Sequence, residues 1–130
     1  MKKKYSIEEA EEVIPQLKSV IKNIRDKARE YSKCLLDATQ LVLNFRENPY
    51  DKDGVLDRTI AVRKELKNLF SNLENFGVIL RDIDRGTLDF PAEVDGEEVF
   101  LCWRALEEDN IRYWHYPAEP CVMRKPLKKT

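Results

Sequence analysis

The sequence is poor in glycine, has a single histidine, and lacks any long apolar run. Its 130 residues include 4 Gly, 6 Pro, 3 Cys and 1 His. No apolar run approaches the ~20 residues of a membrane span. Cys34, Cys102 and Cys121 are odd in number and far apart, without a CxxC pair, which excludes the disulfide framework of small secreted proteins. No apolar export signal follows MKKK. We therefore expect a reduced, soluble, cytoplasmic protein without a membrane partner.

The chain also lacks an excess of charge of either sign. Lys and Arg total 23 against 24 Asp and Glu, giving a net charge of −1, although 36% of residues are charged. Binding to nucleic acid needs a net basic footprint, so nucleic acid is not an expected partner. A glycine-rich phosphate loop, GxSxG and HExxH are all missing from the sequence. Nothing amounts to a catalytic signature, and no cofactor is expected.

The first half of the chain has the spacing of a long helix. Ser6 and Glu9 form a capping-box pattern. The apolar seam that follows alternates steps of three and four, as in a coiled coil. Its members are Ile7, Ala10, Ile14, Leu17, Ile21, Ile24, Ala28, Tyr31, Leu35, Ala38, Val42 and Phe45. Pro15 predicts a kink or short break, and residues 47–54 (ENPYDKDG) predict the turn that ends the helix.

A second, shorter helix is predicted between this turn and Gly77. Its seam is Val55, Thr59, Val62, Leu66, Leu69, Leu73 and Phe76. The short connection predicts an antiparallel helical hairpin over residues 6–76. At ~1.5 Å per residue the first helix is roughly 60 Å long and the second roughly 33 Å. The second helix therefore covers only the later half of the first, and residues 7–24 need another partner.

The later half of the hairpin carries more apolar residues than one helix contact can bury. These residues lie off the two seams and are Leu36, Leu41, Leu43, Ile60 and Phe70. Our hypothesis is a homodimer in which two hairpins form a four-helix bundle. The alternative is that the sheet or the tail covers this stripe.

After Gly77 the pattern changes to that of short strands. Asp95-Gly96 is a strong two-residue hairpin turn. Taken as the turn, it pairs Phe90 with Leu101 and Leu88 with Trp103, because opposed residues share a face. The resulting apolar face is Leu88, Phe90, Ala92, Val99, Leu101 and Trp103. We predict that this face, with Trp103 in the core, covers the start of the first helix.

The last strand can face the core in either of two ways. We favour Ile111, Tyr113 and His115 turned inward, because Arg112 resists burial. The prediction is an α+β fold in one domain, 1–130. It consists of the hairpin at 6–76, kinked near Pro15, packed on a three- to four-stranded antiparallel β-meander at 78–117, with a C-terminal tail at 118–130.

Three residues of the last third could ligate zinc: Cys102, His115 and Cys121. Their spacing matches no standard zinc pattern, and no fourth ligand is identified. With His115 inward, Cys102 also points to the opposite face. For these reasons neither a metal site nor a Cys–His nucleophile is expected.

The charged turn LRDIDRGTLD holds Asp82, Asp84 and Asp89 together with Arg81 and Arg85. Paired carboxylates can hold a cation or act as acid and base. Such a turn is more often held by its own salt bridges and Asx bonds. In the predicted register Asp89 lies diagonally across from Arg104, so we expect a structural ion pair there.

Three stretches of the sequence resemble a bacterial family catalogued as domain of unknown function 2203. They are YSIEEAEEVIP, LENFGVILRDIDRGTLDFPAEVDGEEVFLCWR, and YWH followed by RKPL. The resemblance spans the chain and is most specific in the last third. ALEEDN and Cys121-Val122 depart from the family pattern, so the resemblance implies no role for Cys121. It also implies no activity, cofactor or substrate.

The preferred function is a non-enzymatic, self-associating binding or scaffold protein, acting as a homodimer. Its expected partner surface is the outer sheet face with the charged turn: Asp84, Arg85, Asp89, Arg104, Trp114 and His115. The alternative is a small-molecule- or metal-binding protein or enzyme. Its site would be formed by Asp82, Asp84 and Asp89 with Arg104 and His115.

Overall fold

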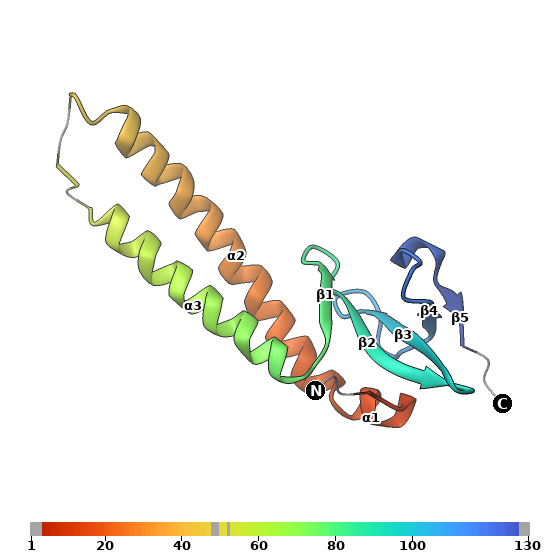
Figure 1. Ribbon diagram of the computed structural model, residues 1–130. Helices are drawn as coiled ribbons and strands as arrows, with labels where there is room; N and C mark the ends of the chain where they lie inside the picture. The colour runs from red at the N-terminus through yellow and green to blue at the C-terminus, as the bar shows by residue number, and fades with distance from the viewer. Residues whose placement is uncertain (1–3, 48–49, 52, 128–130) are drawn as a thin grey trace.

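The computed structural model describes residues 4–47, 50–51 and 53–127. It is an α+β fold, in which a long helical hairpin carries a small sheet at one end (Figure 1). The helices are α1 (Ile7–Glu12), α2 (Ile14–Leu43) and α3 (Val55–Asn75). The strands are β1 (Ile79–Asp82), β2 (Thr87–Val94), β3 (Glu97–Arg104), β4 (Tyr113–His115) and β5 (Lys125–Pro126), with the 3-10 helix η1 (Cys121–Met123) before β5. No helix among the described residues combines the length and apolarity that crossing a membrane requires.

The opening helix is capped and broken as its sequence predicts. The Ser6 hydroxyl accepts from the Glu9 backbone N–H, and the Glu9 carboxylate accepts from that of Ser6. Val13 ends α1 and begins α2, which places Pro15 in the first turn of α2. There its missing N–H costs no helical hydrogen bond. The predicted break near Pro15 is confirmed.

The sheet is antiparallel and follows the chain order β1-β2-β3-β4-β5. The β2–β3 register is the predicted one, including Phe90 opposite Leu101 and Leu88 opposite Trp103. Asp95 and Gly96 have φ values of 53° and 81°, as a tight primed turn requires. The predicted three to four strands are five, because part of the predicted tail forms β5.

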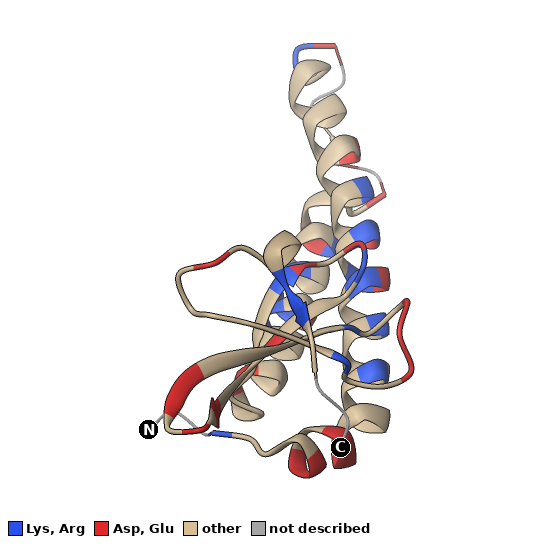
Figure 2. Cartoon of the chain, turned by 90° about the vertical axis from the view of Figure 1, so that its right-hand side faces the viewer, with Lys and Arg blue, Asp and Glu red and all other residues tan. Residues whose placement is uncertain are grey.

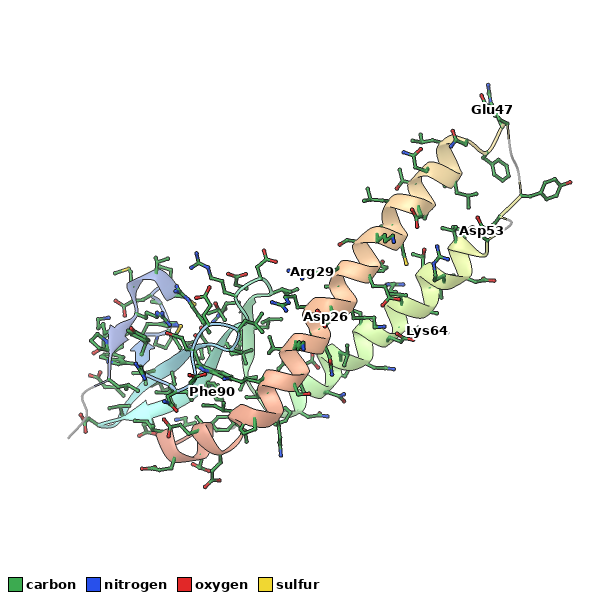
Figure 3. All side chains as sticks on the ribbon, turned by 180° about the vertical axis from the view of Figure 1, so that it is seen from behind. Asp26, Arg29, Glu47, Asp53, Lys64 and Phe90 are labelled. Atoms are coloured by element: carbon green, nitrogen blue, oxygen red, sulfur yellow. The ribbon has the colours of Figure 1, made fainter. Side chains whose placement is uncertain are left out.

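The core lies between the first half of α2 and the apolar face of the sheet. Ile14, Leu17, Ile21 and Ile24 are buried together with Leu88, Phe90, Leu101 and Trp103 in one cluster. Figure 3 shows Phe90 at this contact. The predicted cover of the first helix by the sheet, and the core position of Trp103, are confirmed.

The later half of the hairpin departs from the predicted seam. Cys34 is buried against α3 and Leu41 is half-buried, whereas Leu35, Val42 and Phe45 are 44%, 67% and 57% exposed. On this part of α2, apolar residues spaced by three and four form two adjacent stripes, one through Cys34 and one through Leu35. The Cys34 stripe faces α3, and the predicted Leu35 stripe does not. More apolar surface is therefore left exposed than the sequence pattern predicts.

Gly86 lies at the closest approach of the β1–β2 turn to α2. Its φ is +67°, and a Cβ there would lie 2.8 Å from Ile21 Cγ2 and 3.0 Å from Leu106 Cγ. Gly54 has a similar φ of +64°, but nothing lies within 4 Å of a Cβ added to it. Comparing the same substitution at the two glycines therefore separates the cost of backbone strain from the cost of steric overlap.

We predict that Gly86→Ala lowers the free energy of unfolding by roughly 2–4 kcal/mol, because left-handed strain and overpacking add. Gly54→Ala is the matched control and should cost only the strain, about 1–2 kcal/mol. Urea unfolding followed by circular dichroism measures both. Equal losses in the two variants would contradict the close approach of Gly86 to α2.

Candidate metal centre

Four side chains with metal-ligating atoms converge on the outer face of the sheet. Asp89 comes from β2, Cys102 from β3, His115 from β4 and Cys121 from η1. Their candidate ligand atoms all lie within 4.8 Å of one another. Asp89, Cys102 and His115 are at most 1% exposed, and Cys121 is half-buried. We call these four residues the Cys–His–Asp cluster.

The strand register brings three of the four together. Asp89 lies directly opposite Cys102, and Cys102 lies opposite Tyr113, two residues before His115. Opposed residues share a face and residues two apart along a strand share it too, so all three point outward. Cys121 arrives from the C-terminal segment, which folds back so that its Sγ lies 3.9 Å from His115 Nε2.

The predicted facing of the last strand is wrong for Tyr113 and His115, whereas Ile111 is buried in the core as predicted. Tyr113 and His115 share the outer face with Cys102, while Trp114 lies opposite Leu101 and packs against the core. β4 begins only at Tyr113, so strand alternation does not extend back to Arg112, whose resistance to burial was the basis of the prediction. His115 is nevertheless buried, because the folded-back C-terminal segment shields the outer face. Cys102 and His115 therefore point to the same side of the sheet, not to opposite sides as predicted.

A backbone hydrogen bond orients the imidazole of His115. Its Nδ1 lies 2.8 Å from the Tyr116 carbonyl oxygen, which can only accept, so Nδ1 carries a proton. In the neutral ring Nε2 then presents a lone pair to the cluster, where Asp89 Oδ1 lies 3.0 Å away. Two acceptors at this distance need either a proton between them or a metal ion. Metal-ligating histidines in proteins are commonly oriented by such a bond from the other nitrogen.

The buried Asp89 carboxylate is held by a different arginine from the one predicted. Arg81 of β1 donates from Nε to Asp89 Oδ2 at 2.8 Å. Arg104 instead lies 3.9 Å from Glu107, and its buried Nε has no hydrogen-bond partner among the described residues. The predicted Asp89–Arg104 pair is therefore replaced, because the adjacent strand β1 brings an arginine closer than the diagonal position on β3 does.

Burial keeps both thiols of the cluster protonated. It raises the pKa of the Cys102 thiol to about 12, and the Asp89 carboxylate adds to the rise. Burial and then Asp89 also raise the pKa of the Cys121 thiol, while the guanidinium groups of Arg81 and Arg104 act in the opposite direction. A catalytic cysteine needs a lowered pKa, so the cluster does not have the electrostatics of a Cys–His nucleophile.

Residues 3–127 match the model of the family described as uncharacterized conserved protein (DUF2203). The chain belongs to the DUF2203 family. No curated protein and no solved structure matches the chain. In this DUF2203 protein the cluster therefore has to be interpreted from its own geometry.

The structure does not gather the predicted partner surface of this DUF2203 protein on one open face. Asp84 and Arg85 are exposed on the β1–β2 turn, whereas Asp89 and His115 are buried. Trp114 packs on the opposite, core-facing side. Asp82 accepts from the Asp84 backbone N–H at 3.0 Å, which is the local Asx bond expected of such a turn. Only Asp89 and His115 of the predicted site residues enter the cluster.

The sequence named three of the four donors, Cys102, His115 and Cys121, but its predicted facing kept them apart. Asp89 and Cys102 share a face in the register that Asp95-Gly96 predicts, so a carboxylate beside a thiol was already implied. Asp89 is the fourth ligand that the sequence reasoning lacked. No sequence signal shows that Cys121 folds back onto the sheet.

We predict that the metal-free protein reacts with a thiol reagent at two distinct rates. Cys34→Ala removes the remote thiol, and Cys121 should then react faster than Cys102, because Cys102 is fully buried and has the higher barrier to ionisation. Ellman's reagent at pH 8 measures the two phases, and Cys121→Ser assigns them. A single rate for both thiols would contradict the burial of Cys102.

Proposed function

We propose that the protein binds zinc, or a similar divalent transition metal, at the Cys–His–Asp cluster. The observation that carries the proposal is the convergence of two cysteines, one histidine and one carboxylate within 4.8 Å. Tetrahedral zinc places its ligand atoms about 3.5 Å apart, so only a small contraction is needed. The donors favour this class of metal, because thiolate and imidazole suit zinc while magnesium and calcium prefer oxygen.

The surroundings of the cluster complement the charge of such a site. Two thiolates, one carboxylate and a neutral imidazole around a divalent ion carry a net charge of −1. Arg81 contacts the carboxylate directly, and Arg104 is close enough to lower the pKa of Cys121. Outer groups of this kind orient ligands and offset their charge. The buried Nε of Arg104 has no hydrogen-bond partner among the described residues, so its N–H is not used by another acceptor.

The proposed role of the metal is structural. Four protein ligands close a tetrahedral site, whereas catalytic zinc keeps one position open for water or substrate. Three ligands lie on the sheet and Cys121 lies on η1, so the ion would fasten the C-terminal segment to the sheet. The other described links to that segment include the bidentate Arg124–Glu108 pair, at 3.0 and 3.1 Å, and the two-residue strand β5. This role fits a non-enzymatic binding protein.

The state of the cysteines supports a cytoplasmic location for this function. All three cysteines are free thiols, and Cys34 is buried on α2, far along the chain from the other two. Reduced thiols persist in the cytosol, where a thiol pair remains available to a metal.

We predict that the purified apoprotein binds one equivalent of Co²⁺ and gains the visible and near-ultraviolet absorption of tetrahedral thiolate coordination. Zn²⁺ should displace the Co²⁺ and raise the melting temperature, because the ion binds only the folded state. Absorption spectroscopy and scanning fluorimetry measure both effects. Metal analysis of the wild-type protein tests occupancy without any mutation.

The controls separate the cluster from adventitious binding. Cys102→Ser, Cys121→Ser and His115→Gln should each weaken metal affinity by at least ~10-fold. Cys34→Ser is the matched control and should leave the spectrum unchanged. Absence of thiolate-to-cobalt absorption in the wild-type protein would overturn the proposal and leave a buried His115–Asp89 hydrogen bond.

We predict that metal affinity rises steeply with pH. Both thiols have raised pKa values, so they are protonated at neutral pH and must lose their protons when the metal binds. The logarithm of the apparent association constant should therefore increase by about 2 per pH unit from the two thiols, and by about 3 where the proton between His115 Nε2 and Asp89 is released as well. Competition with a chromophoric chelator between pH 6 and 8 measures this slope. Cys121→Ser should lower the slope by about 1, and a flat profile in the wild type would argue against ligation by both thiols.

A further inference from the structure

The distal part of the hairpin carries most of the exposed apolar side chains of the described chain. Eight of its 13 exposed large hydrophobic residues lie between residues 35 and 60. We call them the apolar tip: Leu35, Leu36, Val42, Leu43, Phe45, Tyr50, Leu56 and Ile60. On α2, Leu35 and Leu36 recur seven residues later as Val42 and Leu43, so the four share one side of the helix.

The apolar tip is not an ordinary solvated helix face. Residues 34–45 contain one charged residue, Asp37, in a chain whose residues are 36% charged. Asp37 is already engaged, because Arg58 of α3 lies 3.5 Å from it. An exposed apolar patch of this size on a soluble chain indicates an association surface.

The exposed area is that of a stable dimer interface. The eight side chains are 44–73% exposed, so each offers roughly 100 Å² of accessible surface. Together they approach the ~800 Å² that each partner contributes to a standard interface. No described part of the chain reaches the apolar tip, because the sheet lies at the other end of the hairpin (Figure 1).

The charges along the hairpin are distributed so that a second copy fits in one orientation. Residues 27–33 and 61–68, in the middle of the hairpin, hold six basic and two acidic residues, and both acidic ones already pair with Lys27. Residues 46–57, around the end of the hairpin, hold four acidic and two basic residues. Figure 2 shows basic segments recurring along the hairpin below its end. In Figure 3, Arg29 and Lys64 extend from the middle, and Glu47 and Asp53 lie at the end.

We infer that the apolar tip docks on the apolar tip of a second copy of this chain, with the two hairpins antiparallel about a twofold axis. This arrangement places the acidic end of each hairpin beside the basic middle of the other. A parallel pairing would bring like charges together. The twofold buries the same surface on both copies and closes the assembly at two chains.

Sedimentation velocity over the micromolar range tests the inference. The wild-type chain should sediment as a dimer that dissociates on dilution. The double variant Leu36→Glu/Leu43→Glu should weaken association by at least ~100-fold. Both residues are exposed, so circular dichroism should show unchanged helix content. Val94→Glu, at a residue 40% exposed on the sheet, is the matched control and should leave the dimer intact.

Charge reversal tests the antiparallel direction. Lys33→Glu and Glu47→Lys should each weaken the dimer, and the double reversal should restore it, because the two positions face each other across the axis. A monomer at every concentration would overturn the inference. A dimer unaffected by Leu36→Glu/Leu43→Glu would also overturn it, as would a monomer that sediments only with anionic lipid vesicles. Removing the metal with a chelator should leave the dimer intact, since the apolar tip lies far from the Cys–His–Asp cluster. The dimer can therefore be tested separately from the proposed metal site.

Discussion

The rest of the structure depends on the burial of the first half of α2 beneath the apolar face of the sheet. α2 has 30 residues and α3 has 21, so α3 cannot cover its partner from end to end. Ile14, Leu17, Ile21 and Ile24 are buried against Leu88, Phe90, Leu101 and Trp103 of the sheet, and the end of α3 adds Leu73 to the same cluster. The same face of the sheet also contacts Tyr5, whose ring centroid lies 5.2 Å from that of Phe90. Each of the two elements supplies the apolar surface that the other lacks.

Committing one face of the sheet to α2 determines what its other face can hold. Strand β2 alternates Leu88 and Phe90, which face the helix, with Asp89, which faces outward. A buried carboxylate is costly unless it is paired, and Arg81 and His115 provide its partners. The outer face is therefore a small polar interior, closed by the C-terminal segment. The donor types gathered there are those that suit zinc and similar transition metals.

Much of the fold could be predicted from the sequence because local signals agreed with one another. Asp95-Gly96 fixed the β2–β3 register, Pro15 marked the helix break, and the unequal seams required the sheet to cover the start of α2. The facing of β4 was mispredicted, since a three-residue strand carries too little alternation to be read alone. Its neighbours and the returning C-terminal segment decide that facing. The β2–β3 register alone places Asp89 beside Cys102. The position of Cys121 depends on the C-terminal segment folding back onto the sheet, for which the sequence has no local signal.

The hairpin projects well beyond the sheet, and this shape has a mechanical consequence. α2 is about 45 Å long at 1.5 Å per residue, and it is anchored to the sheet only at its beginning. A rotation of about 5° at that anchor would displace the far end by about 4 Å, by the geometry of a rod of this length. The hairpin is thus a lever, in which sub-ångström adjustments beneath β2 are converted into movements comparable to the width of a side chain.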